Sequence, residues 1–385
     1  MKRLIICFFA CLIFCTGCNK SSEKTVLKFA SWGSQSEIEI LKPIISEFEK
    51  QNSDLKIEFM HIPQNYFQKI HLLLASNLAP DVIFMNNLNL PVYSDYLMDL
   101  SDYADKKTFY PQTVDALSFA GKVLAIPRDA SNMVVYYNKD LFEKYGINPP
   151  KSSWTFEDLL EIGLEFKKHN IFGISFDEEP IFYLPYLMSN GKGILSDDLS
   201  IVTFDTKDLQ FYSDLRNKYN IAPKKSQSAS ATMAQMFLQQ KIAMQVSGRW
   251  LVPKYREAAE FDWDIINFPN GNVGSIVPMD ASGWAIYKNS KNKELAIKFV
   301  QYLSLKENIE LMTKSGLITP ARIDVANSET FLSGKPASSK VFLEVIKTSK
   351  PTPVSKNYRE LTDNLAQRLE PLFNNLLRQS LDLQP

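Results

Sequence analysis

The sequence predicts an α/β fold built from two interleaved domains. Short strand-like runs alternate with segments of helical periodicity along most of the chain, which is typical of sheets whose strands are joined by helices. The chain has 385 residues, enough for about two domains. No long linker, internal repeat or low-complexity tract divides it. We therefore expect two domains that exchange segments of chain, and not two domains in series.

The first third of the chain has the clearest alternation. Apolar side chains recur there at three- and four-residue spacing, which predicts a helix face formed by Ile38, Leu41, Ile45 and Phe48. Pro43 lies within this face, so the helix should kink or restart there. The predicted order is strand 26–31, helix 38–48, strand 56–62, helix 66–76 and strand 82–85. Strands and helices at this spacing predict a parallel sheet with helical crossovers.

The rest of the chain continues the pattern and ends in helices. Gly146 closes a short helix, and Thr155 with Asp158 resembles a capping box at the start of the next one. The expected strands are 134–138, 242–246, 263–267 and 282–287, and the expected helices are 139–145, 156–168, 208–219 and 231–240. After Lys288 the chain is expected to be almost entirely helical, with a break at residues 319–320.

The N-terminus has the pattern of a secretory signal peptide. Lys2 and Arg3 precede residues 4–14, a run without charged or hydroxylated side chains. A helix over this run would span roughly 16 Å, about half of the hydrocarbon core of a bilayer, so the run is too short to cross a membrane. The alternatives are an ordinary cleaved signal peptide and an uncleaved anchor.

The end of this run resembles a bacterial lipobox. It reads Cys15-Thr16-Gly17-Cys18, although Leu, Val or Ile is usual where Cys15 stands. In a lipobox, a diacylglycerol is attached to the cysteine after the cleavage point, which here is Cys18. We expect a signal peptide with lipobox over residues 1–18, a lipid on Cys18 and a polar tether over residues 19–24.

Composition excludes several classes of protein. All four cysteines lie within the first eighteen residues, so the domains that follow have no disulfide, thiolate metal site or cysteine nucleophile. Lys and Arg together number 43, as do Asp and Glu, and this balance gives no reason to expect a nucleic-acid partner. The 25 Phe and 16 Tyr supply rings that a hydrophobic core and a sugar site both use.

Five motifs follow one another along the chain. They are Ala-Pro-Asp-Val-Ile-Phe at 79–84, Tyr-Tyr-Asn-Lys-Asp-Leu-Phe at 136–142 with Trp-Thr-Phe-Glu-Asp-Leu at 154–159, Ala-Met-Gln-Val-Ser-Gly-Arg-Trp at 243–250, Ser-Gly-Trp-Ala-Ile at 282–286, and the segment 316–322 that ends in Pro-Ala-Arg. In this order they resemble signatures of the family 1 extracellular solute-binding proteins. Any one of them is a weak signal, but five in order behind a lipobox are a strong one.

The resemblance implies a two-lobed periplasmic-binding-protein fold. Each lobe would be a mostly parallel sheet flanked by helices, and the chain would cross the hinge about three times, near 129–133, 283–287 and 319–322. Lobe one would hold residues 25–130 and 286–320, and lobe two would hold residues 133–282 and 321–385. Such a fold implies a monomeric receptor in the cell envelope that captures a carbohydrate, closes around it and delivers it to the permease of an ABC importer.

Candidate ligand-binding residues follow from strand positions. Ligands of open α/β sheets bind beyond the carboxyl ends of the strands. That rule selects Trp32, Tyr66, Asn86, Asn87 and Trp250. The family match also makes Trp250 a ring that faces the sugar, because an aromatic face covers the apolar patch of a pyranose. Residues beside the predicted hinge strands are weaker candidates: Asp129, Ser131, Asp280, Gly283 and Trp284. The alternative for each of these ten residues is a purely structural role.

Catalytic interpretations have little support. His61, His71 and His169 lie in separate segments without a partner at metal-ligand spacing. The sequence has no phosphate-binding glycine loop and no Gly-x-Ser-x-Gly elbow. A glycosidase needs only two carboxylates about 5 to 10 Å apart, which counting acidic residues does not exclude. We expect no catalytic residue, no metal and no cofactor.

Two further interpretations stay open. One is the same fold with a different polar solute, such as a polyamine or a glycerol phosphoester. The other is a surface lipoprotein that acts as an adhesin or sensor partner without transport. An anionic solute would need converging arginines or helix N-termini, and a cationic one would need acidic side chains around the rings. Asn86 and Asn87, which carry no charge, favour a neutral ligand.

The lipobox prediction can be tested at Cys18. Replacing this residue, Cys18→Ser, should release a soluble protein or leave an uncleaved precursor, because lipid chains are what hold such a protein on a membrane. Detergent partitioning and the mass of the mature protein measure both outcomes. A processed variant that partitions into detergent like the wild type would show that Cys18 carries no anchor.

Overall fold

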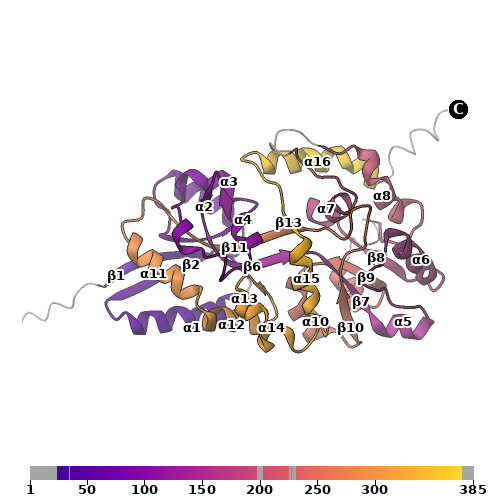
Figure 1. Ribbon diagram of the computed structural model, residues 1–385, viewed down its shortest axis with the longest axis horizontal. Coiled ribbons are helices and arrows are strands. Elements are labelled where there is room, and N and C mark those ends of the chain that lie inside the picture. The colour runs from indigo at the N-terminus through magenta and orange to yellow at the C-terminus, as the bar shows by residue number, and fades with distance from the viewer. Residues whose placement is uncertain (1–23, 34, 197–202, 225–226, 228–230, 375–385) are drawn as a thin grey trace, which may run out of the picture.

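The computed structural model describes residues 24–33, 35–196, 203–224, 227 and 231–374. The predicted signal peptide, the lipobox with Cys18 and most of the tether lie outside these residues. The described chain forms two groups of strands and helices that lie beside each other along the long axis of the molecule (Figure 1). The predicted α/β class is therefore confirmed. We call the group around the larger sheet lobe one and the group around the smaller sheet lobe two.

Lobe one is built on a sheet that contains seven strands among the described residues. The order is β12 (Thr319–Pro320), β6 (Ile126–Asn132), β11 (Pro278–Ile286), β3 (Val82–Asn86), β1 (Thr25–Ser31) and β2 (Leu55–His61), with β13 (Lys350–Pro351) paired to β11. β1 pairs in parallel with both β2 and β3, as the alternation of strand and helix predicts. α1 (Gln35–Gln51) runs unbroken through Pro43, so the predicted restart of this helix does not occur.

Lobe two is built on a four-stranded sheet within the described residues. Its order is β10 (Trp263–Ile266), β7 (Val134–Asn138), β9 (Ile242–Ser247) and β8 (Phe172–Ser175). β7 pairs antiparallel with both of its neighbours, and only β8 and β9 are parallel. The expectation of mostly parallel sheets is therefore wrong for this lobe. In lobe one, β11 also runs antiparallel to β3 and β6, because it returns from lobe two in the opposite direction.

The chain changes sheets at places that differ in part from the predicted crossings. β6 belongs to the larger sheet and β7 to the smaller one, so the change occurs at Met133, inside the predicted range 129–133. Residues 283–286, by contrast, lie within β11 in the larger sheet, and the change of sheet precedes Pro278. β11 is long because it forms part of lobe one and of the hinge at once, which the predicted strand 282–287 missed.

The segment after β12 stays with lobe one longer than expected. Tyr110 N donates to Ala321 O (2.9 Å), and Ile323 N donates to Thr108 O (2.9 Å). α13 (Ile323–Ala326) and α14 (Glu329–Leu332) pack against α12 (Lys306–Lys314), which in turn packs against α1. The chain has reached lobe two by Lys335, whose Nζ donates to Asp262 Oδ1 (2.6 Å), and Ser338 N then donates to Asp264 of β10 (2.9 Å).

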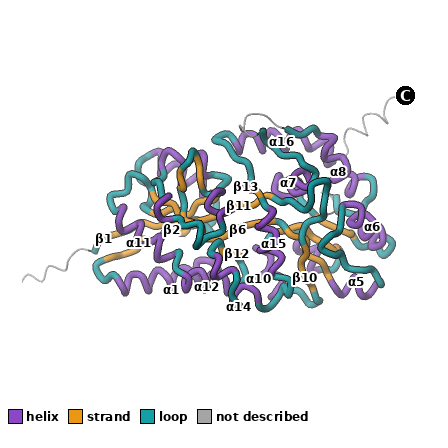
Figure 2. Tube along the Cα trace, viewed as in Figure 1, coloured by secondary structure: helices purple, strands orange, loops and turns teal. Residues whose placement is uncertain are grey.

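Helices cover both sheets and the hinge (Figures 1 and 2). In lobe one, α1 and α12 lie on one side of the sheet and α2 (Tyr66–Ala75) on the other (Figure 1). α15 (Lys340–Thr348) lies against β6, and α16 (Tyr358–Phe373) lies against α8 (Gln210–Asn217) of lobe two. The remaining elements are α3 (Leu90–Tyr93), η1 (Ser94–Tyr96), η2 (Ser101–Tyr103), α4 (Pro111–Ala116), β4 (Ser118–Phe119), β5 (Lys122–Val123), α5 (Lys139–Tyr145), α6 (Phe156–Lys167), α7 (Pro180–Ser189), η3 (Thr206–Leu209), α9 (Met233–Leu238), η4 (Arg249–Leu251), α10 (Val252–Ala258) and α11 (Lys293–Leu303).

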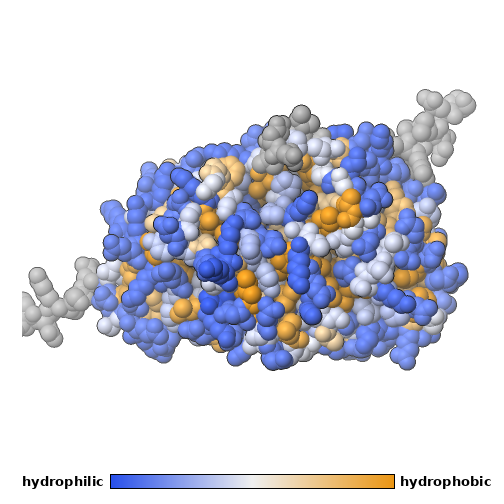
Figure 3. All heavy atoms as spheres, in the orientation of Figure 1, coloured by the Kyte–Doolittle hydropathy of each residue, from blue (hydrophilic) through white to orange (hydrophobic). Residues whose placement is uncertain are grey.

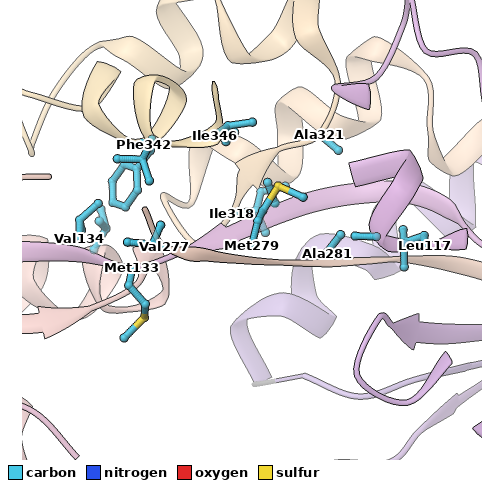
Figure 4. Packing of buried hydrophobic residues seen from close by; sticks show 14 of the residues in the cluster. Leu117, Met133, Val134, Val277, Met279, Ala281, Ile318, Ala321, Phe342 and Ile346 are labelled. Carbon is cyan, nitrogen blue, oxygen red and sulfur yellow. The ribbon is translucent and has the colours of Figure 1, made fainter. Parts of the chain in front are cut away.

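One hydrophobic core runs through both lobes and the hinge. At the hinge, Val134 and Val277 lie on the same side of the strands as Phe342 of α15, and the side chain of Met133 points to the opposite side (Figure 4). The core is well filled on the lobe-one side of this region, because Trp284 of β11 is fully buried and contacts three aromatic or cationic side chains: Phe29, Phe84 and Arg128. The hinge strands are therefore anchored in packed side chains on both faces.

Gly283 is required by this packing. A Cβ at this position would lie 2.1 Å from the backbone oxygen of Ile126 in β6. We expect Gly283→Ala to lower the free energy of unfolding by about 1 to 3 kcal/mol, because backbone must move to admit the methyl group. Denaturant melts measure this loss. The matched control is Gly193→Ala, where the added Cβ would meet its nearest atom at an ordinary 3.5 Å. Equal stability of the two variants would contradict the prediction.

Candidate functional site

A cavity of about 340 Å³ lies between the lobes, and both lobes and the hinge contribute to its wall. Lobe one contributes Trp32, Phe84 and Asn86; the hinge strands contribute residues 128–131 and 280–282; lobe two contributes Ile181, Arg249 and Trp250. A larger cavity of about 830 Å³ lies between lobe two, at Leu184 and Met188, and the strand β13 of the larger sheet, at Lys350 and Pro351. Its described lining residues include no aromatic ring and no carboxylate. The interlobe cavity has both and is the candidate site.

Two indole rings are exposed at this cavity. Trp32 follows β1 in lobe one and is 46% exposed, and Trp250 lies in η4 of lobe two and is 38% exposed. Large apolar rings are usually covered in a folded protein, so two that line one cavity from opposite lobes indicate a binding surface. The ring of Trp32 rests on Phe84, with ring centroids 5.9 Å apart.

The charges at the base of the cavity are paired with one another. Arg128 of β6 donates to Asp129 through Nε (2.7 Å) and Nη2 (2.6 Å), and its Nη1 is 3.7 Å from Glu37 of α1. Ser282 Oγ of β11 donates to the same Asp129 oxygen (2.8 Å). Burial opposes the charge of Arg128, but Asp129 and Glu37 outweigh it and raise the pKa of the guanidinium. This network ties β6, β11 and α1 together.

Asp280 of β11 is held by two neutral donors. Asn87 Nδ2 (3.0 Å) and Thr352 Oγ1 (2.6 Å) both donate to its Oδ1. Burial raises the pKa of this carboxyl, and the hydrogen bonds from Thr352 and Asn87 act in the opposite direction. Because both donors use Oδ1 and Asp280 lines the cavity, Oδ2 is left to accept a hydrogen bond from a ligand hydroxyl.

The side chain of Asn86, at the end of β3, uses its oxygen in hydrogen bonds within the protein and leaves its amide N–H groups available. Its Oδ1 accepts from Asn89 N (3.1 Å) and from Asn89 Nδ2 (2.9 Å). The Nδ2 group of Asn86 has no partner among the described residues, so it is left to donate into the cavity. Ser131 of β6 also lines the cavity and adds a hydroxyl group.

Arg249, beside Trp250, is buried without a hydrogen-bond acceptor. None of its three side-chain nitrogens has a partner among the described residues. The guanidinium carbon lies 4.1 Å from the ring centre of Phe331 and 5.1 Å from that of Phe342. Burial lowers the pKa of Arg249 to about 9. Because this pKa is still above neutral, the folded protein carries a buried charge that only ring faces stabilise.

Six of the ten residues selected from the sequence lie at this cavity. They are Trp32, Asn86, Asp129, Ser131, Trp250 and Asp280. The structure does not bring the other four to its wall. Tyr66 is buried, and its hydroxyl donates to Ala30 O (3.1 Å) and Phe84 O (3.0 Å). Asn87 is buried between Asp280 and the backbone N of Ala281.

Gly283 and Trp284 were selected because the chain was expected to cross the hinge near them. In the structure both residues lie inside β11. Gly283 packs against the backbone of β6, and Trp284 belongs to the core of lobe one. Tyr66 and Trp284 both contact Phe84, with ring centroids 6.1 and 5.9 Å from its own. Of these three rings, only that of Phe84 lines the cavity.

Four further residues that line the cavity were missed by the sequence analysis. Arg128 and Ser282 adjoin selected residues on the two hinge strands, but their side chains complete the ion-pair network. Phe84 lies in the Ala-Pro-Asp strand, where an apolar residue is expected to be core. Arg249 directly precedes Trp250 in a quoted motif. Their positions in or near strands could have suggested these four residues. Nothing in the sequence indicated which side chains each of them contacts.

The described residues contain no group of three or more His, Cys, Asp or Glu side chains placed to hold a metal ion. Among the helices described here, none is long and apolar enough to span a membrane. The face of the molecule in Figure 3 is mostly hydrophilic, with apolar residues scattered between polar ones.

Two α/β lobes around a cavity of aromatic and polar side chains define a binding protein of the two-lobed periplasmic type. The model of the family described as bacterial extracellular solute-binding protein matches residues 32–310. This match covers well over half of the chain, so the chain belongs to that family.

Similar proteins have named carbohydrate ligands. The melibiose/raffinose/stachyose-binding protein MelE of Bacillus subtilis is 24% identical over 358 residues, which cover 82% of this chain and 80% of the relative. The structure of an ABC substrate-binding protein from Listeria monocytogenes in complex with cycloalternan has 26% identity and a TM-score of 0.82, and the match covers 91% of this chain and 94% of that one. The GacH receptor of Streptomyces glaucescens has 20% identity and a TM-score of 0.79, with coverage of 91% and 94%, and shares the fold.

The unpaired charge of Arg249 yields a stability prediction. Burial lowers the pKa of Arg249 from its ordinary value to about 9, which is still above neutral, so the penalty for burying this charge is fully present at pH 7. Arg249→Met keeps much of the apolar stem and removes the charge. We expect it to raise the free energy of unfolding by about 1 to 3 kcal/mol in denaturant melts at pH 7. The exposed Arg359→Met is the control, with no expected change. A loss of stability in Arg249→Met alone would mean that its contacts with Phe331 and Phe342 outweigh the desolvation cost.

Proposed function

We propose that this protein is the extracytoplasmic substrate-binding component of an ABC importer and captures a sugar or oligosaccharide. One observation carries the proposal: two exposed indole rings from opposite lobes line the same cavity as Asn86, Asp280 and Ser131. Indole faces cover the apolar face of a pyranose, and amide, carboxylate and hydroxyl groups bind its hydroxyls. The ligands named for MelE and for the Listeria protein are carbohydrates, which supports this choice.

Binding would act through hinge closure. Trp32 and Trp250 belong to different lobes, so a ligand in contact with both favours the arrangement in which the lobes are close. β6 and β11 form the floor between them. Binding free energy therefore shifts the open–closed equilibrium, and the closed form is the one that a permease would recognise. In this proposal the protein acts as a monomer and has no catalytic role.

The proposed location is the outer side of a bacterial membrane. The matched family is described as extracellular. The lipobox at Cys15-Thr16-Gly17-Cys18 supports anchoring through lipid on Cys18, with residues 19–24 as the tether. An anchored receptor stays near its permease, which raises the effective concentration at which the two meet.

The charge pattern favours a neutral solute over a polyamine or a glycerol phosphoester. Arg128 is already paired with Asp129 and Glu37, so it is not left to bind a phosphate. Arg249 is enclosed by two phenyl rings. Three carboxylates line the cavity, but Glu37 and Asp129 are paired with Arg128. The third, Asp280, already accepts from two neutral donors. A polyamine would require several acidic side chains around the rings that are not already paired with a cation.

A ligand screen tests the proposal. Purified protein lacking residues 1–18 is melted with raffinose, stachyose, maltotriose or cycloalternan, and with spermidine or glycerol 3-phosphate as comparators. A ligand present at 100 times its Kd should add about 2.7 kcal/mol to the stability of the folded state. Calorimetry then measures the affinity of each stabilising compound. Stabilisation by spermidine or glycerol 3-phosphate, with none by the saccharides, would overturn the choice of a sugar.

Trp250 should dominate the affinity. We expect Trp250→Ala to weaken saccharide binding by about 2 to 4 kcal/mol, the range for a buried aromatic anchor. Since the ring lies at the cavity and not in a lobe core, folding stability should fall by less than the roughly 3 to 5 kcal/mol of a core tryptophan truncation. Calorimetry and denaturant melts on the same samples measure both quantities. The control is Trp154→Phe, which alters a buried ring of lobe two that does not line the cavity and should leave the affinity unchanged. Unchanged affinity with a large stability loss in Trp250→Ala would make Trp250 a core residue.

A further inference from the structure

We propose that Gly248 is a positioning residue that sets the orientation of the Trp250 ring in the interlobe cavity. The proposal rests on the proposed function, in which Trp250 contacts the ligand. Its basis is a close approach: the indole of Trp250 folds back over the backbone of Gly248, where only a glycine leaves room for it.

The geometry of this approach leaves no space for a side chain. A Cβ built on Gly248 would lie 1.9 Å from Cζ3, 2.4 Å from Cε3 and 2.5 Å from Cη2 of the Trp250 ring. Carbon atoms in contact are ordinarily about 3.5 to 4.0 Å apart. All three atoms belong to the six-membered part of the indole, so a substituent would press on the ring itself. The ring therefore rests against the Cα of residue 248.

The backbone of Gly248 does not itself need a glycine. Its φ of −101° and ψ of −178° are extended values that any residue adopts. Strand β9 ends at Ser247 and η4 begins at Arg249, so residue 248 joins the two elements. The requirement at this position is thus for space beside the Trp250 ring, and not for unusual backbone torsion angles.

The surrounding contacts determine which group would yield to a larger residue. Tyr136 Oη donates to Gly248 O (2.8 Å), which holds the backbone of residue 248. Arg249 is enclosed by Phe331 and Phe342, which holds the next residue. Trp250 itself is 38% exposed, so its ring can rotate into open space. A side chain at 248 would therefore turn the indole and leave the fold in place.

A turned indole changes what the cavity can bind. Stacking on a pyranose depends on the plane of the ring relative to the sugar, and Trp32 on the other lobe fixes the opposite side of the cavity. Gly248 thereby controls affinity and the shape of sugar accepted without touching the ligand. The contacts of Arg249 with Phe331 and Phe342 hold the backbone between Gly248 and Trp250 in place.

The first test needs no ligand. The chain has five tryptophans, so a nitrogen-15 spectrum of the protein lacking residues 1–18 should show five indole N–H signals, and Trp250→Phe identifies that of Trp250. Gly248→Ala should move this signal and leave the one from buried Trp284 in place. Gly193→Ala is the control and should move neither. An unmoved Trp250 signal in Gly248→Ala would overturn the proposal, and so would loss of the folded state, because the ring and not the backbone is expected to yield.

The second test is a double-mutant cycle with the saccharide that the screen finds, raffinose being the first probe. Gly248→Ala should weaken binding about tenfold in the wild-type background and less than twofold in a Trp250→Ala background. Equal weakening in both backgrounds, or none in either, would overturn the proposal. If no saccharide binds the wild type, the sugar function fails, and the indole signal alone still decides whether Gly248 positions Trp250.

Discussion

At the base of the cavity, Arg128 is buried against Phe84 and Trp284 and shares Asp129 with Ser282 of the neighbouring strand. A guanidinium in this place would cost several kcal/mol if it were unpaired, so the two acidic side chains together offset most of the cost of burying it. Because Glu37 belongs to α1, the same cation also joins the hinge strands to a helix of lobe one. The stiffness of β6 and β11 as a cavity floor depends on this network.

The groups available to a ligand are those that remain after structural bonds have been made. Asp280 uses Oδ1 to hold Asn87 and Thr352, and Asn86 uses Oδ1 to hold Asn89. These bonds fix each side chain before a ligand arrives, so little conformational freedom is lost on binding. The same reasoning explains why buried Asn87 supports the site without lining it. A polar cavity of this kind is preorganised by the hydrogen bonds that shape its own wall.

Much of the fold could be predicted from the sequence, and the site only in part. Periodicity located β1, α1, β2 and β3 because their apolar faces are regular, and strand ends pointed to Trp32, Asn86 and Trp250, which line the interlobe cavity. Strand direction in lobe two could not be predicted, since it depends on where distant segments enter the sheet. Tyr66 and Trp284 carry rings of the kind that contact sugars, but both are buried and contact Phe84, which lines the cavity. Local sequence does not encode which of two contacting rings lines a cavity.

The central position of β11 also affects how the chain can acquire its structure. Asn87 and Ala281, joined by a hydrogen bond of 3.0 Å, are 194 residues apart, and β11 fills the space between β3 and β6. A chain that emerges from the ribosome N-terminus first therefore has β1 to β3 long before the strand that completes their sheet. Contacts of such large sequence separation slow folding, because a long loop must close before they form. If the protein is exported as we propose, late closure of its first sheet would keep the chain open enough to pass through a secretion channel.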